Sequence, residues 1–183
     1  FLTTGIVIPH QNSNYKIKNV LLPVYFDEKK FNLLHAGSLL KQRPPHHLIF
    51  AFEKFLDKNP SAKENTMLIF LGGNIYHQEF LKEYQNQIPQ LYISDGYVPY
   101  DEVRLVQNSV CVNIIMEAEA ELSPFLPGKF PHCVEANKAI LHLGPKKSEV
   151  MNLLGDDYPF HCETDDVEKT ALLIENLYLM WKN

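Results

Sequence analysis

The sequence predicts an α/β protein, a Rossmann-like three-layer sandwich built on a mostly parallel sheet of about six strands. Two observations support this prediction. Short, unbroken apolar runs alternate along the chain with longer segments whose apolar residues recur at helical spacing. The apolar runs also lack the polar alternation of a half-exposed strand, which is typical of strands that a parallel sheet buries on both faces.

Each expected element ends at residues that interrupt regular structure. We expect strands at 31–37, 66–73, 91–94, 109–116, 139–143 and 158–162. We expect helices at 44–58, 76–87, 100–107, 129–137, 146–154 and 165–181. Glycine-bearing loops follow four of the strands, at Gly37, Gly72, Gly96 and Gly144. The carboxyl ends of parallel strands place such loops on one rim of the sheet, where ligands of these folds bind.

The last expected helix is the longest and has a clear apolar face. Its spacing places five residues on one stripe, namely Val167, Ala171, Ile174, Tyr178 and Trp181. We expect this stripe to dock on the sheet.

Residues 31–183 form the predicted domain, and residues 1–30 differ from it. Two short β-leaning runs, at 5–9 and 20–25, flank a polar stretch. We therefore expect residues 1–30 to be a linker or a partial strand pair from an interdomain region. The chain begins with Phe1 rather than Met, and we expect it to be one piece of a longer protein.

Composition and charge argue against several classes of function. The formal net charge of −5 disfavours a nucleic-acid surface, which normally carries a basic excess. The three cysteines, Cys111, Cys133 and Cys162, are odd in number and widely spaced, so neither a disulfide framework nor a metal knuckle is indicated. A reducing, cytoplasmic location is expected. No run approaches the roughly 20 apolar residues of a membrane span.

The stretch from 121 to 150 organises the rest of the chain. Its loop, with Pro124, Pro127 and Gly128, brings Ser123 and Lys129 to the start of an expected helix. A hydroxyl, an ammonium and unpaired backbone N–H groups together suit a phosphate, so we interpret this stretch as an anion site. Two alternatives stay open: the prolines and the glycine also fit an ordinary loop, and Lys129 also fits a structural pairing with a nearby glutamate.

Basic side chains gather on the same predicted rim although the chain is acidic. They are Lys41, Arg43, Lys129, Lys146 and Lys147. An arginine and a lysine on two different loops can hold a diphosphate from both sides. Each of these residues is also compatible with a solvated surface charge, and Lys146 and Lys147 fit a solvated helix start better than a site.

Other motifs narrow the chemistry. The sequence contains no G-x-G-x-x-G and no P-loop motif, which disfavours nicotinamide and P-loop readings. No G-x-S-x-G elbow is present, so Ser123 is not expected to be a hydrolase nucleophile. The His46–His47 pair fits a structural or solvated role better than a metal site. No Asp-x-Asp motif or His/Asp cluster offers ligands to a divalent ion, so no metal and no cofactor are expected.

Taken together, the chain resembles the carboxy-terminal, donor-nucleotide-binding half of GT-B glycosyltransferases, in particular the family 4-like group. Four motifs carry the resemblance: HAGSLLKQR, LIFLGG, SDGYVPYDEV and SPFLPGKFPHCVEANKAILHLGPKKSEV. The resemblance implies one half of a GT-B fold that binds a UDP- or GDP-linked sugar. It implies hexosyl transfer to a glycan or lipid-linked acceptor held by a missing amino-terminal domain, as in polysaccharide biosynthesis. The fragment alone would be inactive, and the full-length protein would contact the inner face of a membrane peripherally.

The resemblance also implies roles for individual residues. Arg43 and Lys129 match the two basic residues that bind the donor diphosphate, and we assign them the catalytic role. The remaining donor-site positions are Gly37, Ser38, Gly72, Tyr97, Val98, Ser123, Phe125, Leu126, Pro127, Gly128 and His132. Tyr97 and Val98 would flank the nucleotide base. His132, one turn after Lys129, would hydrogen-bond a ribose hydroxyl.

Three positions depart from the family pattern. Ser38 stands where many members have an arginine, and Pro124 and His132 stand where many members have two glutamates. The sugar contact would then pass to Ser123 and to backbone N–H groups around 125–128. The lost glutamates favour an alternative, a non-catalytic Rossmann-like binding or scaffold domain. A second alternative is a sugar-nucleotide epimerase of the same architecture.

Overall fold

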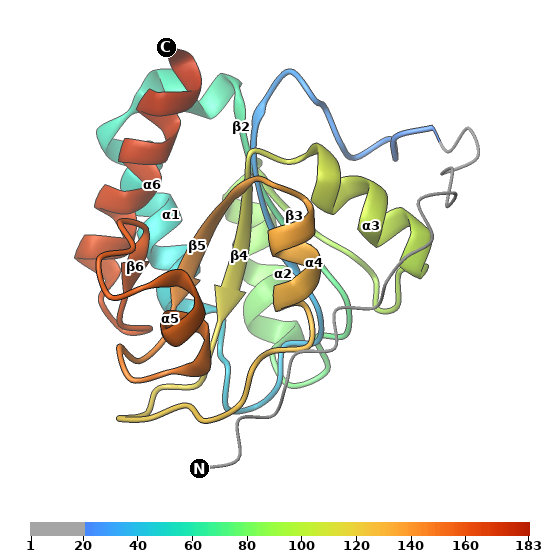
Figure 1. The fold of residues 1–183 in the computed structure, drawn as a ribbon. Coiled ribbons are helices and arrows are strands. Elements are labelled where there is room, and N and C mark those ends of the chain that lie inside the picture. Colours follow the sequence, from blue (N-terminus) through green and yellow to red (C-terminus); the bar gives the residue numbers. More distant parts are fainter. Residues whose placement is uncertain (1–20) are drawn as a thin grey trace.

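The computed structural model describes residues 21–183 as one six-stranded sheet flanked by helices (Figure 1). The strand order is β3-β2-β1-β4-β5-β6, and all five pairings are parallel. The strands are β1 (Phe31–Ala36), β2 (Thr66–Leu71), β3 (Leu91–Ile93), β4 (Val112–Met116), β5 (Ala139–Leu143) and β6 (His161–Cys162). The helices are α1 (His46–Lys58), the short 3-10 turn η1 (Pro60–Glu64), α2 (Gln78–Gln87), α3 (Tyr100–Ser109), α4 (Phe130–Glu135), α5 (Glu149–Leu154) and α6 (Val167–Lys182). The predicted fold class is confirmed.

The register aligns the carboxyl ends of the central strands. Ala36 pairs with Leu71 across β1 and β2, and Met116 pairs with Leu143 across β4 and β5. The loops that follow these strands therefore leave the same edge of the sheet. Because β1 lies between β2 and β4, the order of the strands reverses at this point, and a crevice opens outside the carboxyl ends.

The sheet is buried on both faces, as its unbroken apolar strands predict. All six residues of β1 and all five residues of β4 are buried. On one face the core contains residues of α1, α2 and α6, and on the other it contains residues of α3, α4 and α5. Neighbouring side chains of a strand alternate between the two layers, with Leu33 in the first core and Leu34 in the second. The result is a three-layer sandwich.

The last helix docks as predicted. Of the five residues on its expected stripe, Ala171, Ile174 and Tyr178 are buried, and Val167 and Trp181 are half-buried. The Tyr178 hydroxyl donates to Asn65 Oδ1 at 3.0 Å, which ties the end of the helix to the loop before β2. Within residues 21–183, this and every other helix is too short or too polar to cross a membrane.

Most elements are shorter than predicted, and three differences are the most informative. The helix expected at 129–137 spans only Phe130–Glu135, because Asn137 takes a left-handed conformation at φ 51° and ends it. The helix expected at 146–154 begins at Glu149, because the Ser148 hydroxyl accepts from the Met151 amide and caps it there. The strand expected at 158–162 is reduced to β6.

The segment before β1 forms turns rather than a strand over the residues described, from 21 onward, so the β-leaning run at 20–25 is not a strand there. The run at 5–9 lies outside the described residues. Tyr25 stacks on Tyr92 of β3 with ring centroids 4.1 Å apart, and its hydroxyl donates to Glu102 at 2.8 Å. Burial, and then the Glu102 carboxylate, raise the pKa of Tyr25 above its usual value. These contacts fasten the segment to the α3 face of the sheet.

Candidate functional site

One pocket occupies the crevice at the carboxyl ends of β1 and β2. Its volume is about 490 Å³, a size typical of ligand sites. Its lining comes from the ends of β1 and β2 and their loops, from α3 with the loop before it, and from the start of α4. The lining residues are Ala36, Gly37, Ser38, Leu71, Gly72, Gly73, Tyr97, Val98, Tyr100, Val103, Gln107, Gly128, Lys129 and His132. The edge of the sheet at which we expected a ligand to bind therefore contains a cavity.

The two glycine loops touch each other at one end of this pocket. Gly37 and Gly72 have φ angles of 131° and 130°, which side-chain-bearing residues rarely adopt. A Cβ on Gly72 would lie 2.8 Å from the Gly37 carbonyl carbon. The Leu39 amide donates to the Gly73 carbonyl, and the Gly72 amide donates to the Ser94 hydroxyl. This end of the pocket is thus bare, fixed backbone that a ligand can approach closely.

Lys129 lines the pocket and is the residue immediately before α4. Burial, opposed by Cys133 and assisted by the charge of Arg43, lowers the pKa of Lys129 to about 7. Within residues 21–183 no carboxylate pairs with Lys129 or with Arg43. The structural pairing that would have engaged Lys129 is not found, since Glu135 pairs with Arg104 instead. Among residues 21–183, the pocket therefore presents a lysine amine without a carboxylate partner, and this amine can take up a proton when an anion binds.

Arg43 lies close to Lys129 without lining the pocket. Its side chain is half-buried in the loop between β1 and α1, and its charge influences both Lys129 and His35. His35, near the end of β1, is only 2% exposed. Burial, and then the charges of Lys129 and Arg43, hold its pKa well below the usual value, so it stays neutral. His35 was not predicted, because it lies inside an apolar strand run.

Another part of the pocket lining is apolar and aromatic. Tyr97, Val98, Tyr100 and Val103 line it from α3 and the loop before that helix. Gln107, on α3, is a buried polar side chain in the lining, and its amide makes a weak contact of 3.9 Å with the Cys133 sulfur. The lining therefore combines the amine of Lys129 with apolar and aromatic side chains. Gln107 was not predicted, since a glutamine in an amphipathic helix gives no sign of which way it faces.

His132 also lines the pocket, as predicted for a residue one turn after Lys129. Its ring faces Tyr100 with centroids 5.8 Å apart. Burial, and then the Arg104 charge, lower its pKa. The Arg104 guanidinium is 7% exposed and donates to the His132 carbonyl and to Glu135. Arg104 thereby fastens α4 to α3 and sets the position of His132.

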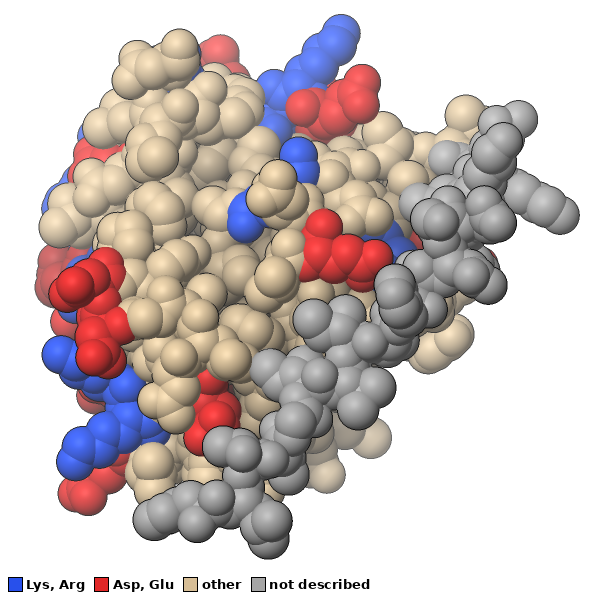
Figure 2. All heavy atoms as spheres, viewed as in Figure 1, with Lys and Arg blue, Asp and Glu red and all other residues tan. Residues whose placement is uncertain are grey.

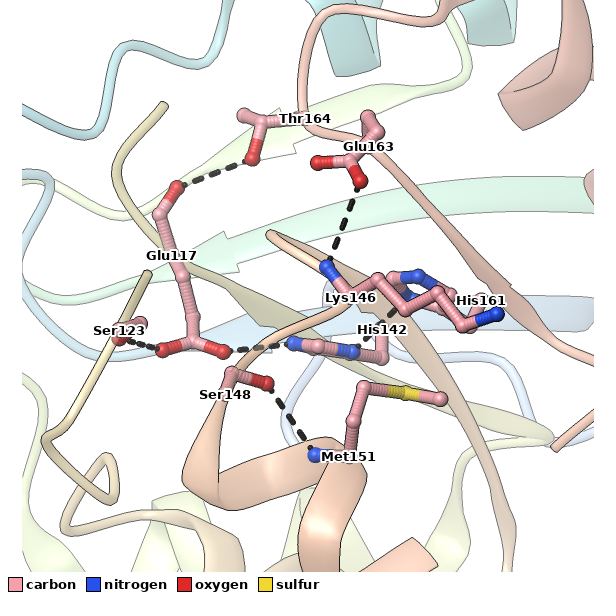
Figure 3. Close-up of polar contacts among 9 residues, drawn as sticks. All are labelled: Glu117, Ser123, His142, Lys146, Ser148, Met151, His161, Glu163 and Thr164. Atoms are coloured by element: carbon pink, nitrogen blue, oxygen red, sulfur yellow. Dashed lines mark hydrogen bonds and ion pairs between the residues drawn. The ribbon is translucent and has the colours of Figure 1, made fainter. Parts of the chain in front are cut away.

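Ser123 does not join Lys129 in the pocket, in contrast to the shared anion site predicted. Its hydroxyl donates to the Glu117 carboxylate (Figure 3). Its amide donates to the Lys147 carbonyl, and its carbonyl accepts from the Glu149 amide. Glu117 was not predicted to have a role, and this buried acid binds Ser123 outside the pocket lining.

Three more predicted residues lie outside the pocket lining. In the loop after Ser123, Phe125 is 76% exposed, Leu126 is half-buried and Pro127 is buried, and only Gly128 reaches the pocket. Pro124 is exposed as well. The loop passes over the core around α4 and α5, where Leu126 packs, and not over the glycine loops.

Lys146 and Lys147 line two other hollows, which contain carboxylates. One, of about 560 Å³, includes Glu119, Glu121 and Glu163, and the other includes Glu149 and Asp156. On the face shown in Figure 2, basic and acidic side chains are interspersed and much of the surface is uncharged. Lys41 is exposed and lies outside the pocket. Within residues 21–183, no group of three or more His, Cys, Asp or Glu side chains is placed to hold a metal ion.

Comparison with known proteins shows the fold. No family model and no curated protein matches the sequence. A trehalose 6-phosphate synthase from Burkholderia multivorans matches 83% of this chain with a TM-score of 0.66 and 10% identity. A mutant of S. aureus TarM, in complex with UDP among other ligands, matches 87% with a TM-score of 0.64 and 11% identity. The catalytic domain of a cholesterol-α-glucosyltransferase from Helicobacter pylori matches 83% with a TM-score of 0.61 and 16% identity.

The matched lengths differ. This chain spans 36% of the first protein, 30% of the second and 87% of the third. The similarity confirms the predicted Rossmann-like fold. One of the three proteins that share this fold over the matched part is a sugar transferase.

Proposed function

We propose that this chain is the donor-nucleotide-binding domain of a GT-B glycosyltransferase. One observation supports the proposal: a single pocket combines touching glycine loops, aromatic and apolar side chains, and a Lys129 that has no carboxylate partner among residues 21–183. A nucleoside diphosphate has the same two-part chemistry, an anionic diphosphate joined to a flat base. The pocket is large enough for such a ligand.

The diphosphate lies at the glycine loops, where Lys129 and Arg43 supply positive charge. In sugar transfer the bond between the sugar and the diphosphate breaks, and negative charge builds up on the departing diphosphate. Fixed cations that face this charge stabilise the transition state. Lys129 and Arg43 supply that charge from protein side chains, so we expect nucleotide binding without a divalent ion.

The base lies against the apolar and aromatic lining side chains, which include Tyr97, Val98 and Val103. Gln107 is the polar side chain on this wall, and His132 lies where a ribose hydroxyl can accept or donate a hydrogen bond. The TarM complex with UDP supports a uridine nucleotide, and UDP and GDP are the nucleotides to test first.

The wider activity is also part of the proposal. We assign hexosyl transfer to a glycan or lipid-linked acceptor that a separate amino-terminal domain binds, with this fragment inactive alone. The glucosyltransferase among the similar structures supports a hexose donor. We place the full-length protein in the cytoplasm, at the inner face of the membrane, in polysaccharide biosynthesis.

One observation favours a second candidate, a non-catalytic nucleotide-binding or scaffold domain. No carboxylate lines the pocket among the residues described. Many family 4-like enzymes have glutamate at two positions that are occupied here by Pro124, which is exposed, and by His132. The same absence leaves the epimerase without the carboxylate pair that it needs. Sugar turnover by the full-length protein separates a transferase from a scaffold.

The test uses two lysines of this chain. Lys129→Ala removes a charge-assisted contact, and we expect the affinity for UDP or GDP, measured by calorimetry in EDTA, to fall roughly ten- to a hundredfold. Lys146→Ala, in a different hollow, is the matched control and should bind like the parent. Equal affinities for the two variants, or binding that requires a metal, would remove the pocket from consideration as the donor site.

A further inference from the structure

A buried carboxyl group organises the loop that leads to Lys129. Glu117, immediately after β4, is 1% exposed. One of its oxygens accepts from the Ser123 hydroxyl, and the other lies 2.7 Å from His142 Nε2 (Figure 3). Burying a carboxylate is costly unless such bonds compensate for its lost hydration. The position of this side chain is therefore specified by its partners.

The residues around Glu117 restrict the position of its side chain. His142, on β5, is fully buried, and its Nδ1 lies 3.1 Å from His161 Nδ1 on β6. A Cβ on Gly144 would lie 2.8 Å from His142 Nε2 and 3.1 Å from Glu117 Oε1, so only glycine fits beside the pair. The Thr164 hydroxyl donates to the Glu117 carbonyl at 3.3 Å. Three strands thus fix the carboxyl group.

Ser123 transfers this fixed position to the loop. Its hydroxyl binds Glu117, its amide donates to the Lys147 carbonyl at 2.9 Å, and its carbonyl accepts from the Glu149 amide at 3.1 Å. Only residues 124–128 separate Ser123 from Lys129, and two of them are prolines with restricted φ. The Phe130 amide then donates to the Pro127 carbonyl at 2.9 Å and closes the turn into α4.

We infer that Glu117 and Ser123 are positioning residues that anchor the loop 123–129, so that Gly128 and Lys129 face the pocket. Neither residue lines that pocket, so both act through the loop. The ligand part of this inference rests on the proposed function. The anchoring part does not, and it can be tested on the empty protein.

The experiment compares four variants of the chain: Ser123→Ala, Glu117→Ala, Glu117→Gln and Thr164→Val. Hydrogen exchange of the Phe130 amide reports whether the turn at 127–130 is held, the melting temperature reports stability, and calorimetry reports UDP and GDP affinity. Thr164→Val is the matched control, because it removes a hydrogen bond to the Glu117 backbone and leaves the Ser123 contact intact. Glu117→Gln tests geometry, since its amide can accept from Ser123 and donate to His142.

We expect Ser123→Ala and Glu117→Ala to speed exchange of the Phe130 amide on the order of tenfold and to weaken nucleotide binding by a similar factor. Glu117→Gln should preserve both properties. Thr164→Val should lower the melting temperature while exchange at Phe130 and nucleotide affinity stay at the parent's values. Residues that only stabilised the fold would not separate the melting temperature from Phe130 exchange and nucleotide affinity in this way.

Two results overturn the inference: unchanged exchange at Phe130 in Ser123→Ala, or equally fast exchange in Thr164→Val. If the parent binds no nucleotide, the proposed function fails, and the exchange data still decide whether the loop is anchored. If Glu117→Ala does not fold, Ser123→Ala and Glu117→Gln decide the question alone.

Discussion

Among single residues, Lys129 has the most unusual environment. Burial lowers its pKa from 10.5 to about 7. Between pH 7 and 10.5 the unfolded chain therefore holds a proton on this lysine that the folded, empty chain does not. The unfolded state binds more protons in this window, so the stability of the empty chain rises with pH across it. A diphosphate in the pocket would reverse this preference by stabilising the ammonium.

This reversal predicts a pH dependence of binding. Above pH 7, a nucleoside diphosphate sugar must recruit a proton to Lys129, so we expect affinity to fall by up to about tenfold per pH unit. Lys129→Arg remains charged throughout and should bind with little change from pH 7 to 9. Calorimetry in buffers of different ionisation enthalpy measures the proton uptake directly. A parent affinity as flat as that of the arginine variant would contradict the assignment.

Gly72 tests the contact between the two glycine loops. Gly72→Ala places a methyl group against the Gly37 backbone at a left-handed φ, so we expect a loss of about 1–3 kcal/mol in the free energy of unfolding. Gly128→Ala is the control, because no atom lies within 4 Å of its Cβ position, and it should change stability by less than about 0.5 kcal/mol. Denaturant unfolding measures both, and similar values for the two variants would argue against the contact.

Among the elements, α4 depends most on its neighbours. With only six residues it is too short to be stable by itself, and α3 holds it through Arg104. The two partners differ in burial, since the side chain of Arg104 is 9% exposed and that of Glu135 is 45% exposed. Removing the acid strands a buried charge, whereas removing the arginine leaves a carboxylate that water can reach.

This asymmetry predicts which variant costs more. Glu135→Ala should lower the free energy of unfolding by about 1–3 kcal/mol. Arg104→Met, which keeps most of the buried volume, should cost less. Chemical denaturation of the two variants compares them directly, and a larger loss for Arg104→Met would show that the arginine contributes mainly through its packing or its bond to the His132 carbonyl.

The elements also show what sequence can predict. Strands such as β1 and β4 were predictable because a strand buried on both faces is mostly apolar and lacks polar alternation. The path of the loop 117–129 could not be predicted, because it depends on the contact between Glu117 and His142 on the neighbouring strand β5. No local sequence pattern indicates that contact. Ser123 was therefore assigned to the wrong neighbours. His35 and Gln107 were missed for a related reason, since burial of a polar group is a tertiary property.

At the scale of the whole molecule, the sheet places every part of the candidate site. The reversal of strand order between β1 and β4 opens the crevice, and the loops after β1, β2 and β4 all reach it. The pocket remains open on one side, so a bound nucleotide would stay partly hydrated. We expect a Kd on the order of tens to hundreds of micromolar for the isolated chain.

The most direct test of the proposed nucleotide site is a crystal structure of this chain soaked with UDP or with GDP at millimolar concentration, without divalent ions. We expect electron density for the nucleotide in the pocket, with the diphosphate at the Gly37 and Gly72 loops and within hydrogen-bonding distance of Lys129. The base should lie against Tyr97, Val98 and Val103. Nucleotide bound in the hollows around Lys146 and Lys147, or an empty pocket with both ligands, would contradict it.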